Sequence, residues 1–323
     1  MKHDEQLPPS RHFRLEQLAD GVYAAIHVDG GWAMCNAGIV DLGDRTLVFD
    51  TFLTPRASED LRTAAEALTG RPVSAVINSH YHNDHIWGNQ VFGCQTDVIS
   101  TVETRQCIVS EGMEAYEWYK DNAASELVSL EAQYKAAEDQ AQRQELSSWI
   151  SYHQGLVEAF PALTVRPPNV TFAERLAFYG TERRAELMAC RGGHSPSDAV
   201  LYLPAEGILF MGDLFFVGCH PYLSGGDPDN VARTLDMVGG FNPQALVPGH
   251  GPVGTLEDVR LLSRYINVLD SLARKMVEDG EPEEKVTTVG IPEPFDEWEY
   301  RSFFAQSMRF FYQRHSNMSN WAR

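Results

Sequence analysis

A cluster of side chains that can bind metal ions directly follows an apolar, strand-like run, and it constrains the fold more than any other feature. The run VSAVI is followed at residues 78–90 by NSHYHNDHIWGNQ, which contains three histidines and an aspartate. Side chains two apart in an extended segment point the same way, so His80 and His82 can bind one ion together. Asp84 and His85 lie where the chain turns into the next predicted helix, and they point in another direction. One short loop can therefore supply ligands to two neighbouring ions, at a strand end where α/β proteins place their sites.

The apolar pattern around this cluster predicts alternating layers of helix and strand. Residues 21–50 have the alternation and turn residues of a β-meander, and residues 56–69 form an amphipathic helix before the strand VSAVI. This order favours an α/β fold. Further short strands are predicted at NVTFAERLAFY, RAELMAC, DAVLYLP, GILFMGD and ALVPGH.

Two helical regions interrupt or follow these strands. We predict one domain over residues 18–323, with a helical insert at 105–165 and a C-terminal helical segment at 256–323 packed on it. The insert is too long for an ordinary connection, and such excursions are usually functional or independently structured. We expect it to wall the site, and Trp118, Tyr119 and Tyr116 suggest an aromatic wall there, with a helical packing face as the alternative for these three. A helical hairpin packed away from the site, or a contact between two subunits of a homodimer, are the alternatives.

Three later positions add polar side chains at strand ends. His194 lies in the glycine-rich turn RGGHSPSD, before a predicted strand. Asp213 follows the apolar run ILFMG, and His250 ends the run ALVPGH between two glycines. Each is a good metal ligand, although any one alone could be a loop residue with a structural hydrogen bond.

Together, in this order, these residues resemble the metallo-β-lactamase superfamily, whose pattern is HxHxDH followed by His, Asp and His. The resemblance covers most of residues 20–255 apart from the insert, and it implies an αββα sandwich of two mixed β-sheets flanked by helices. It implies a first metal held by His80, His82 and His194, a second held by Asp84, His85 and His250, and Asp213 as the bridge. Asp84 and Asp213 are the ligands that we also expect to take part in catalysis.

The identity of the bridging residue indicates which branch of the superfamily the chain resembles. Class B β-lactamases generally carry Cys or Ser at this place, whereas glyoxalase II, lactonases and related hydrolases carry Asp. The segment GDLFFVGCHPY is similar to the glyoxalase II segment around its bridging aspartate. The resemblance therefore favours this branch and disfavours a β-lactam substrate.

Three further residues are candidates for supporting roles. Asp50 ends the strand TLVFD and matches the family's aspartate beside the metal loop, where it would orient a ligand imidazole. His220 and Tyr222 follow the bridging aspartate closely and could contact substrate or stabilise an oxyanion. Their spacing differs from that of the lactonases, so packing or loop structure is the alternative for both.

The ligand set predicts hydrolysis by a hydroxide that bridges two divalent cations. Metal coordination lowers the pKa of water from 15.7 to about 7, and the second cation can steady the leaving group. We expect zinc, with iron or manganese as alternatives, and an ester, thioester, lactone or amide-type bond as the target. The sequence contains no GxSxG motif or phosphate-binding loop that would support another mechanism.

Two other classes of protein remain open. Persulfide dioxygenases resemble the same branch but use a single iron, so an oxidoreductase is an alternative, as is a β-lactam hydrolase. Flavodiiron proteins usually have Glu where this chain has His82. A non-catalytic module is disfavoured because such relatives tend to lose ligands and this chain keeps all of them.

Charge and cysteine content restrict partners and location. The net charge of −19 disfavours binding to nucleic acid or to an anionic membrane surface, and leaves a small-molecule substrate as the expected partner. The N-terminal residues lack a secretory signal, and the five cysteines are scattered, as in reduced thiols. We therefore expect a cytoplasmic protein.

Overall fold

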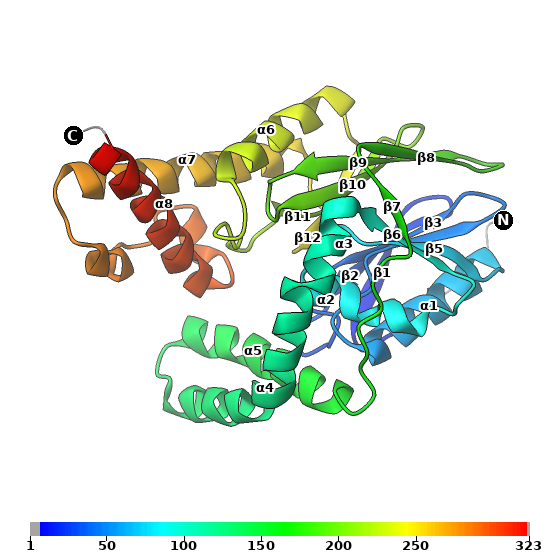
Figure 1. Ribbon diagram of the computed structural model, residues 1–323, viewed down its shortest axis with the longest axis horizontal. Coiled ribbons are helices and arrows are strands. Elements are labelled where there is room, and N and C mark those ends of the chain that lie inside the picture. The colour runs from blue at the N-terminus through cyan, green and yellow to red at the C-terminus, as the bar shows by residue number, and fades with distance from the viewer. Residues whose placement is uncertain (1–6, 322–323) are drawn as a thin grey trace.

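The computed structural model describes residues 7–321 and contains two β-sheets enclosed by helices (Figure 1). The first sheet holds β1 (Phe13–Ala19), β2 (Val22–His27), β3 (Ala37–Asp41), β4 (Thr46–Phe49), β5 (Val73–Ile77), β6 (Asp97–Thr101) and β7 (Val170–Phe172). The second holds β8 (Arg175–Tyr179), β9 (Arg184–Arg191), β10 (Ser197–Leu203), β11 (Ile208–Phe216) and β12 (Ala245–His250). The α-helices are α1 (Pro55–Thr69), α2 (Asn83–Ile86), α3 (Val102–Val109), α4 (Glu111–Ala136), α5 (Gln140–Ala159), α6 (Pro228–Val238), α7 (Leu256–Glu278) and α8 (Arg301–Trp321). Short 3-10 helices are η1 (Trp87–Val91), η2 (Gly239–Phe241), η3 (Glu283–Thr288) and η4 (Phe295–Glu297).

Both sheets are mixed. In the first, β1 to β4 are antiparallel and β4 to β7 are parallel. In the second, β8 to β11 are antiparallel, and β12 runs parallel to β11 at the edge. The strand orders are β1 to β7 in sequence and β12-β11-β10-β9-β8.

The main core lies between the two sheets, and the alternation of β2 shows how the sequence builds it. Val22, Ala24 and Ile26 belong to the apolar cluster that joins the two sheets, whereas Tyr23 and Ala25 belong to the cluster under α1. This is the two-residue period of a strand that is covered on both faces.

Helix α1 covers the outer face of the first sheet. Thr54 caps its N-terminus by accepting a hydrogen bond from the Ala57 amide, and Gly70 ends it in the left-handed conformation with φ 68°. Its apolar stripe, which includes Leu61 and Ala65, packs against the sheet. The helix predicted at residues 56–69 is confirmed.

Helices α6, α7 and α8 cover the second sheet. Leu262, Tyr265 and Leu269 of α7 share one buried cluster with residues of β9 to β11, and Met308 and Phe311 of α8 join the same cluster. The layers therefore run helix, sheet, sheet, helix. The predicted αββα sandwich is confirmed.

Two strands differ from the prediction. Residues 169–179 were predicted as one strand, but β7 pairs with β6 in the first sheet and β8 pairs with β9 in the second. The chain crosses between the sheets at Ala173 and Glu174. At the N-terminus, β1 begins at Phe13, ahead of the predicted domain start at residue 18.

The region predicted as an insert forms α3, α4 and α5. Its buried side chains, among them Ile108, Ala123 and Leu156, pack on Ile86 and Trp87 just after the histidine-rich loop. In Figure 1, α4 and α5 lie below the gap at the left and α8 lies above it. The two helical regions therefore flank the same end of the sandwich.

All five cysteines are free thiols, and Cys94 is exposed while the other four are buried. Within residues 7–321, none of the helices combines the length and the apolar character needed to cross a bilayer.

Candidate metal centre

The histidine-rich loop leaves β5 and brings its side chains to the edge where β11 and β12 also place theirs. His80 and His82 precede α2, whose first turn carries Asp84 and whose last residues include His85. His80 and His85 are fully buried.

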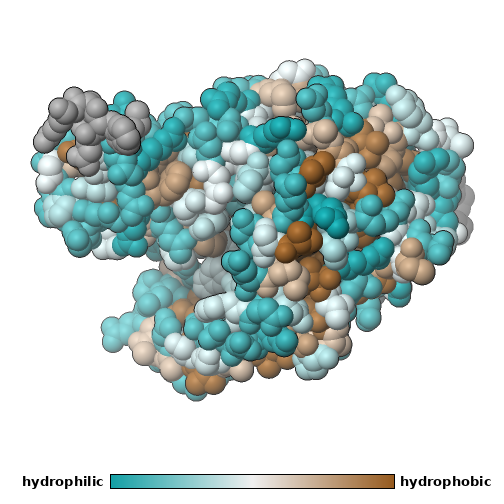
Figure 2. Space-filling model, in the orientation of Figure 1, coloured by the Kyte–Doolittle hydropathy of each residue, from teal (hydrophilic) through white to brown (hydrophobic). Residues whose placement is uncertain are grey.

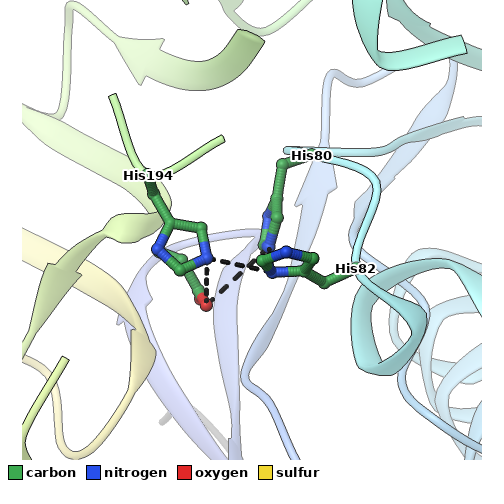
Figure 3. A group of neighbouring side chains, drawn as sticks. His80, His82 and His194 are labelled. Atoms are coloured by element: carbon green, nitrogen blue, oxygen red, sulfur yellow. Dashed lines mark hydrogen bonds and ion pairs between the residues drawn. The ribbon is translucent and has the colours of Figure 1, made fainter. Parts of the chain in front are cut away.

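Three histidines form one group. His82 Nδ1 lies 3.0 Å from His80 Nε2 and 3.0 Å from His194 Nε2, and Figure 3 shows the three rings converging. Asp213 Oδ2 lies 3.2 Å from His194 Nε2 and 3.7 Å from His80 Nε2. The four ligand atoms lie within 4.8 Å of one another, close enough to share one cation, and four is the usual ligand number for zinc.

A second group lies beside the first. His85 Nε2 and His250 Nε2 lie 3.2 and 3.4 Å from Asp213 Oδ1. Asp84 Oδ2 lies 3.6 Å from His85 Nε2 and 3.5 Å from His250 Nε2. The structure thus brings all seven predicted ligands together, in the two sets of three that the sequence suggested.

Asp213 joins the two sets because its oxygens face different groups. Gly212 adopts a left-handed φ of 52° where the pairing of β11 with β12 shifts register, and this irregularity re-aims the next side chain. Gly249 leaves room for the carboxylate, since an added Cβ there would lie 1.9 Å from Asp213 Oδ1. The presence of glycine at positions 212 and 249, beside Asp213 and His250, therefore has a steric explanation.

The buried atoms of this centre fit a divalent cation. His85 Nε2 and Asp213 Oδ1 are buried without a hydrogen-bond partner among the described residues. Such atoms are costly unless something else binds them. Imidazole nitrogens with carboxylate oxygens are a donor set that suits Zn²⁺, and also iron.

Electrostatics point the same way. Burial lowers the pKa of His194 to about 3 and holds that of His80 well below its usual value, so both rings are neutral and can offer a lone pair. Burial would raise the pKa of Asp213, but His250 and His85 beside it hold that pKa well below its usual range. His80, His194 and Asp213 are therefore in the deprotonated form that a metal ligand needs. Burial lowers the pKa of His85 and His250, but the acidic side chains beside them raise both pKa values above the usual one, so a cation bound there would displace their protons.

Asp50 orients two of the ligand rings. Its Oδ2 lies 2.8 Å from His85 Nδ1, and it accepts from Ser79 Oγ, which lies 2.9 Å from His80 Nδ1. Because the serine donates to the carboxylate, it accepts from His80 Nδ1, which leaves Nε2 of both rings free for a cation. The supporting role that the sequence suggested for Asp50 therefore has a direct geometric basis.

We expect Asp50→Asn to weaken metal binding about 10–100-fold, the usual cost of losing a partner that orients metal ligands. Asn keeps the shape and tolerates the left-handed φ of 60° at this position, so the fold should persist. Metal affinity is measured by competition with a chromophoric chelator. Asp20→Asn, at an exposed aspartate, is the matched control. Equal affinities for the two variants would contradict this role.

The sequence did not reveal the residues that fix the backbone on either side of the metal-ligand histidines. Asn36 is buried and donates from Nδ2 to the Pro248 and Gly251 carbonyls, at 3.0 and 2.8 Å, on either side of His250. Asp198 accepts from the Ser195 amide and hydroxyl next to His194, and burial raises its pKa to about 7. The sequence signals were weak: Asn36 is a polar residue inside an apolar run, and Asp198 directly precedes one.

Cys35 also lies close to the centre but is explained by packing. Its thiol donates to the Asp84 carbonyl at 2.9 Å, and burial raises its pKa to about 12. We therefore leave Cys35 out of the ligand set, although it lies near Asp84 and His85.

A cavity of about 330 Å³ opens on the metal centre, and we call it the aromatic cavity. Figure 2 shows the surface hollowed at the left, between the two helical regions. Its aromatic walls come from the insert (Tyr119, Trp149 and Tyr152), from the end of β11 and the loop after it (Phe216 and Tyr222), and from Tyr300, just before α8, and Phe303 in its first turn.

The other sequence candidates can now be placed around the aromatic cavity. Tyr222 lines it, with its ring 6.2 Å from those of His82 and His194. His220 also lines it, but its Nδ1 lies 2.9 Å from the Tyr265 hydroxyl. Of the three insert aromatics suggested for the wall, Tyr119 lines the cavity, whereas the prediction is wrong for Tyr116 and Trp118. Tyr116 packs against Trp87 and Phe160. Trp118 is 50% exposed and is not among the lining residues, because it lies on the solvent side of α4.

The sequence agrees with a known family over this same region. Residues 30–250 match the profile described as "Metallo-beta-lactamase superfamily". The chain belongs to this superfamily. Its members are mostly metal-dependent hydrolases that bind divalent metal ions, and the cluster of His80, His82, His194 and Asp213 fits such a site.

Solved structures show the same fold at low sequence identity. The metallo-β-lactamase from Pontibacter korlensis is 16% identical with a TM-score of 0.56, and the match covers 79% of this chain and 99% of that one. The metallo-β-lactamase from Erythrobacter litoralis is 16% identical with a TM-score of 0.55, covering 80% and 98%. The sec-alkyl sulfatase PisA1 is 17% identical with a TM-score of 0.66, covering 94% of this chain and 50% of that one. These likenesses concern the fold, and the glyoxalase II and lactonase branch of the superfamily stays a prediction.

Proposed function

We propose that this protein is a dinuclear metal-dependent hydrolase, acting on an ester, thioester, lactone or amide-type bond. The strongest support is that the two carboxylate oxygens of Asp213 face different groups of ligands. One oxygen faces the three-histidine group, and the other faces His85 and His250. A carboxylate shared in this way is suited to two neighbouring cations.

In this proposal His80, His82 and His194 hold one ion and Asp84, His85 and His250 hold the other. Two bound divalent cations supply Lewis acidity and make water a stronger acid. The donor set of imidazoles and carboxylates favours zinc, with iron or manganese as alternatives.

The chain's own residues bind and orient the substrate and limit the access of water. Among the residues that line the aromatic cavity, Cys219 is the only one with a serine, threonine, cysteine or lysine side chain. It is 2% exposed, and burial raises its pKa far above the usual range, so it is not a nucleophile. Tyr222 lies on the cavity wall beside the three-histidine group, where its hydroxyl can donate to an oxygen of the substrate.

A sulfate ester is a second candidate substrate. The structure named as a sec-alkyl sulfatase matches 94% of this chain, which takes in the C-terminal helices beyond the matched family profile. An apolar cavity beside a metal pair also suits an alkyl chain next to an anionic head. We keep carboxylic esters, thioesters and lactones as the primary class because the bridging aspartate favours that branch.

We expect two metal ions per chain in the wild type and one in His250→Ala, because that variant keeps the three-histidine group intact. Elemental analysis after loading with zinc and removal of free ion measures this. His315→Ala, at a histidine bonded to Asp270 on α7, is the matched control and should keep both ions. One ion per chain in the wild type, unchanged in His250→Ala, would overturn the dinuclear proposal.

The same loaded protein should be tested on lactones, thioesters, aryl esters, β-lactams and sec-alkyl sulfates. We expect turnover in the first three groups. Turnover of β-lactams or sulfates alone would replace the primary substrate class. Bound iron with oxygen uptake on a persulfide, and no hydrolysis, would replace the hydrolase with a dioxygenase.

A further inference from the structure

The aromatic cavity has a wall made by two helices that lie far apart in the sequence. Trp149 of α5 makes edge contacts with Tyr300 and Phe303 at the start of α8, at 6.0 and 5.8 Å between ring centres. Glu145 of α5 accepts from the Ser302 amide at 3.1 Å and so stabilises the first turn of α8. The wall is therefore formed by packed helices in place of a loose loop, and its rings have fixed positions.

The charged side chains that line the aromatic cavity lie at its metal end; Arg301, which adds to the effect of burial in lowering the pKa of His220, is not a lining residue. The acidic side chains that line it are the ligands Asp84 and Asp213, the ligand His250 lies beside them, and no lysine or arginine side chain is among the lining residues. His220 is neutral because burial lowers its pKa to about 4. The chain as a whole carries a net charge of −19, so its long-range field adds no attraction for an anion.

These two observations limit what can bind beyond the reacting bond. A carboxylate moved from water into this aromatic space would lose hydration without gaining a cationic partner, which is costly. A flat or branched apolar group would lose only water contacts and would gain contact with the rings of Trp149, Phe303 and Tyr222. The volume of about 330 Å³ is at the lower end of small-molecule sites, so one ring or a short branched chain fills it.

We infer that the substrate is uncharged outside its reacting group, with one aromatic ring or a short apolar chain held between α5 and α8 by Trp149 and Phe303. This inference rests on the proposed hydrolase and names its substrate class. Trp149 and Phe303 set the width of the cavity and so determine specificity, while the metal centre determines the bond that is cleaved.

A matched pair of substrates tests the inference. 4-Acetoxybenzamide and 4-acetoxybenzoate have the same reacting ester and nearly the same shape, but only the second carries a charge at the far end of the ring. We expect zinc-loaded protein to show a kcat/KM at least about tenfold higher for the benzamide, the discrimination expected for a lost contact of 1.4 kcal/mol. Each value is divided by the rate of the same ester with hydroxide in solution, which removes the difference in leaving groups. Non-productive binding of the carboxylate to the metals does not alter kcat/KM.

Substitutions in the wall of the aromatic cavity test which residues determine kcat/KM for the two esters. Trp149→Ala should lower kcat/KM for the benzamide about tenfold with both metals still bound. Trp118→Ala, at the exposed tryptophan of α4, should leave kcat/KM unchanged. Gln306→Lys places a cation at the mouth of the aromatic cavity and should shift the preference toward the benzoate by about tenfold.

The outcomes separate this inference from the hydrolase proposal. Equal kcat/KM for the two esters, or a higher value for the benzoate in the wild type, overturns the inference and leaves the hydrolase standing. A Trp149→Ala variant that matches Trp118→Ala overturns the role of the wall. Absence of hydrolysis of every substrate with both metals bound overturns the hydrolase, and the inference falls with it.

Discussion

Asp213→Ala should lose about 10³-fold or more in kcat/KM, the largest effect on activity that we expect from one substitution. A metal pair supplies several kcal/mol of transition-state stabilisation, and each 1.36 kcal/mol corresponds to a factor of ten. The Nε2 atoms of His85, His194 and His250 lie 3.2–3.4 Å from the oxygens of Asp213. All three lose this shared anion in the variant. The measurement is kcat/KM on the best substrate, with metal content determined on the same sample.

Two further variants make this result interpretable. Asp213→Asn keeps the shape of the side chain but not its charge, and it should behave almost like the alanine variant. Asp236→Ala changes an exposed aspartate of α6 and should be neutral. Circular dichroism and a melting curve establish that the variants are folded. Near-normal turnover by folded Asp213→Ala would show that the bridging role is wrong.

Phe210→Ala should cost about 3–5 kcal/mol of unfolding free energy, the usual range for a buried aromatic side chain cut back to alanine. Phe210 is fully buried between the sheets. Its ring occupies the space that Gly38 leaves open, since an added Cβ there would lie 2.4 Å from Phe210 Cε1, and its ring centre lies 5.9 Å from that of Phe49. Truncation therefore leaves a cavity that neither sheet can close without moving. Urea unfolding followed by circular dichroism measures the loss.

Tyr179→Ala is the control for this experiment. Tyr179 ends β8 and is 69% exposed, so its loss should change the unfolding free energy by no more than about 0.5 kcal/mol. A change in the midpoint with an unchanged slope would assign the effect of Phe210→Ala to native packing. A loss below about 1 kcal/mol would mean that the sheets close over the gap, against the packing described here.

The metal centre was predictable because its residues carry their chemistry in local sequence. His80 to His85 lie in one loop after an apolar strand, and His250 ends β12. Asp213 was predicted to end its strand, but it lies inside β11, next to the irregularity at Gly212. Strand ends on one edge of a sheet converge, so ligand types at those places indicate a shared site. Residue type and position in the chain indicated the cluster, and the resemblance to the superfamily supplied its division between two ions.

The walls of the aromatic cavity were not predictable in the same way. Trp149 and Phe303 meet only through the packing of α5 on α8, and each lies in a helix whose apolar residues could equally face a core. The exposed Trp118 looked as suitable as its neighbour Tyr119, because the facing side of a helix depends on what it packs against. Periodicity indicates that a helix has an apolar face but does not identify the surface that covers it.

The division of residues 169–179 between two sheets has a similar cause. Val170, Phe172, Leu176 and Phe178 keep a two-residue period that is interrupted only at Glu174, so the pattern resembles a single strand. The change of sheet is set by pairing with β6 on one side and with β9 on the other. Those partners are distant in sequence, and local propensity contains no information about them.

The placement of the ligands has a consequence for chain topology. The histidine-rich loop belongs to the first sheet, whereas His194, Asp213 and His250 belong to the second, and His82 and His194 are 112 positions apart. A bound cation is then a reversible cross-link that closes a long loop of the polypeptide, as a disulfide does in an oxidising compartment. Because all five cysteines are free thiols, this chain has no covalent link of that kind. With ions bound as proposed, the two halves of the sandwich are tied together to a degree set by the supply of metal, and metal starvation would loosen the fold as well as halt the proposed catalysis.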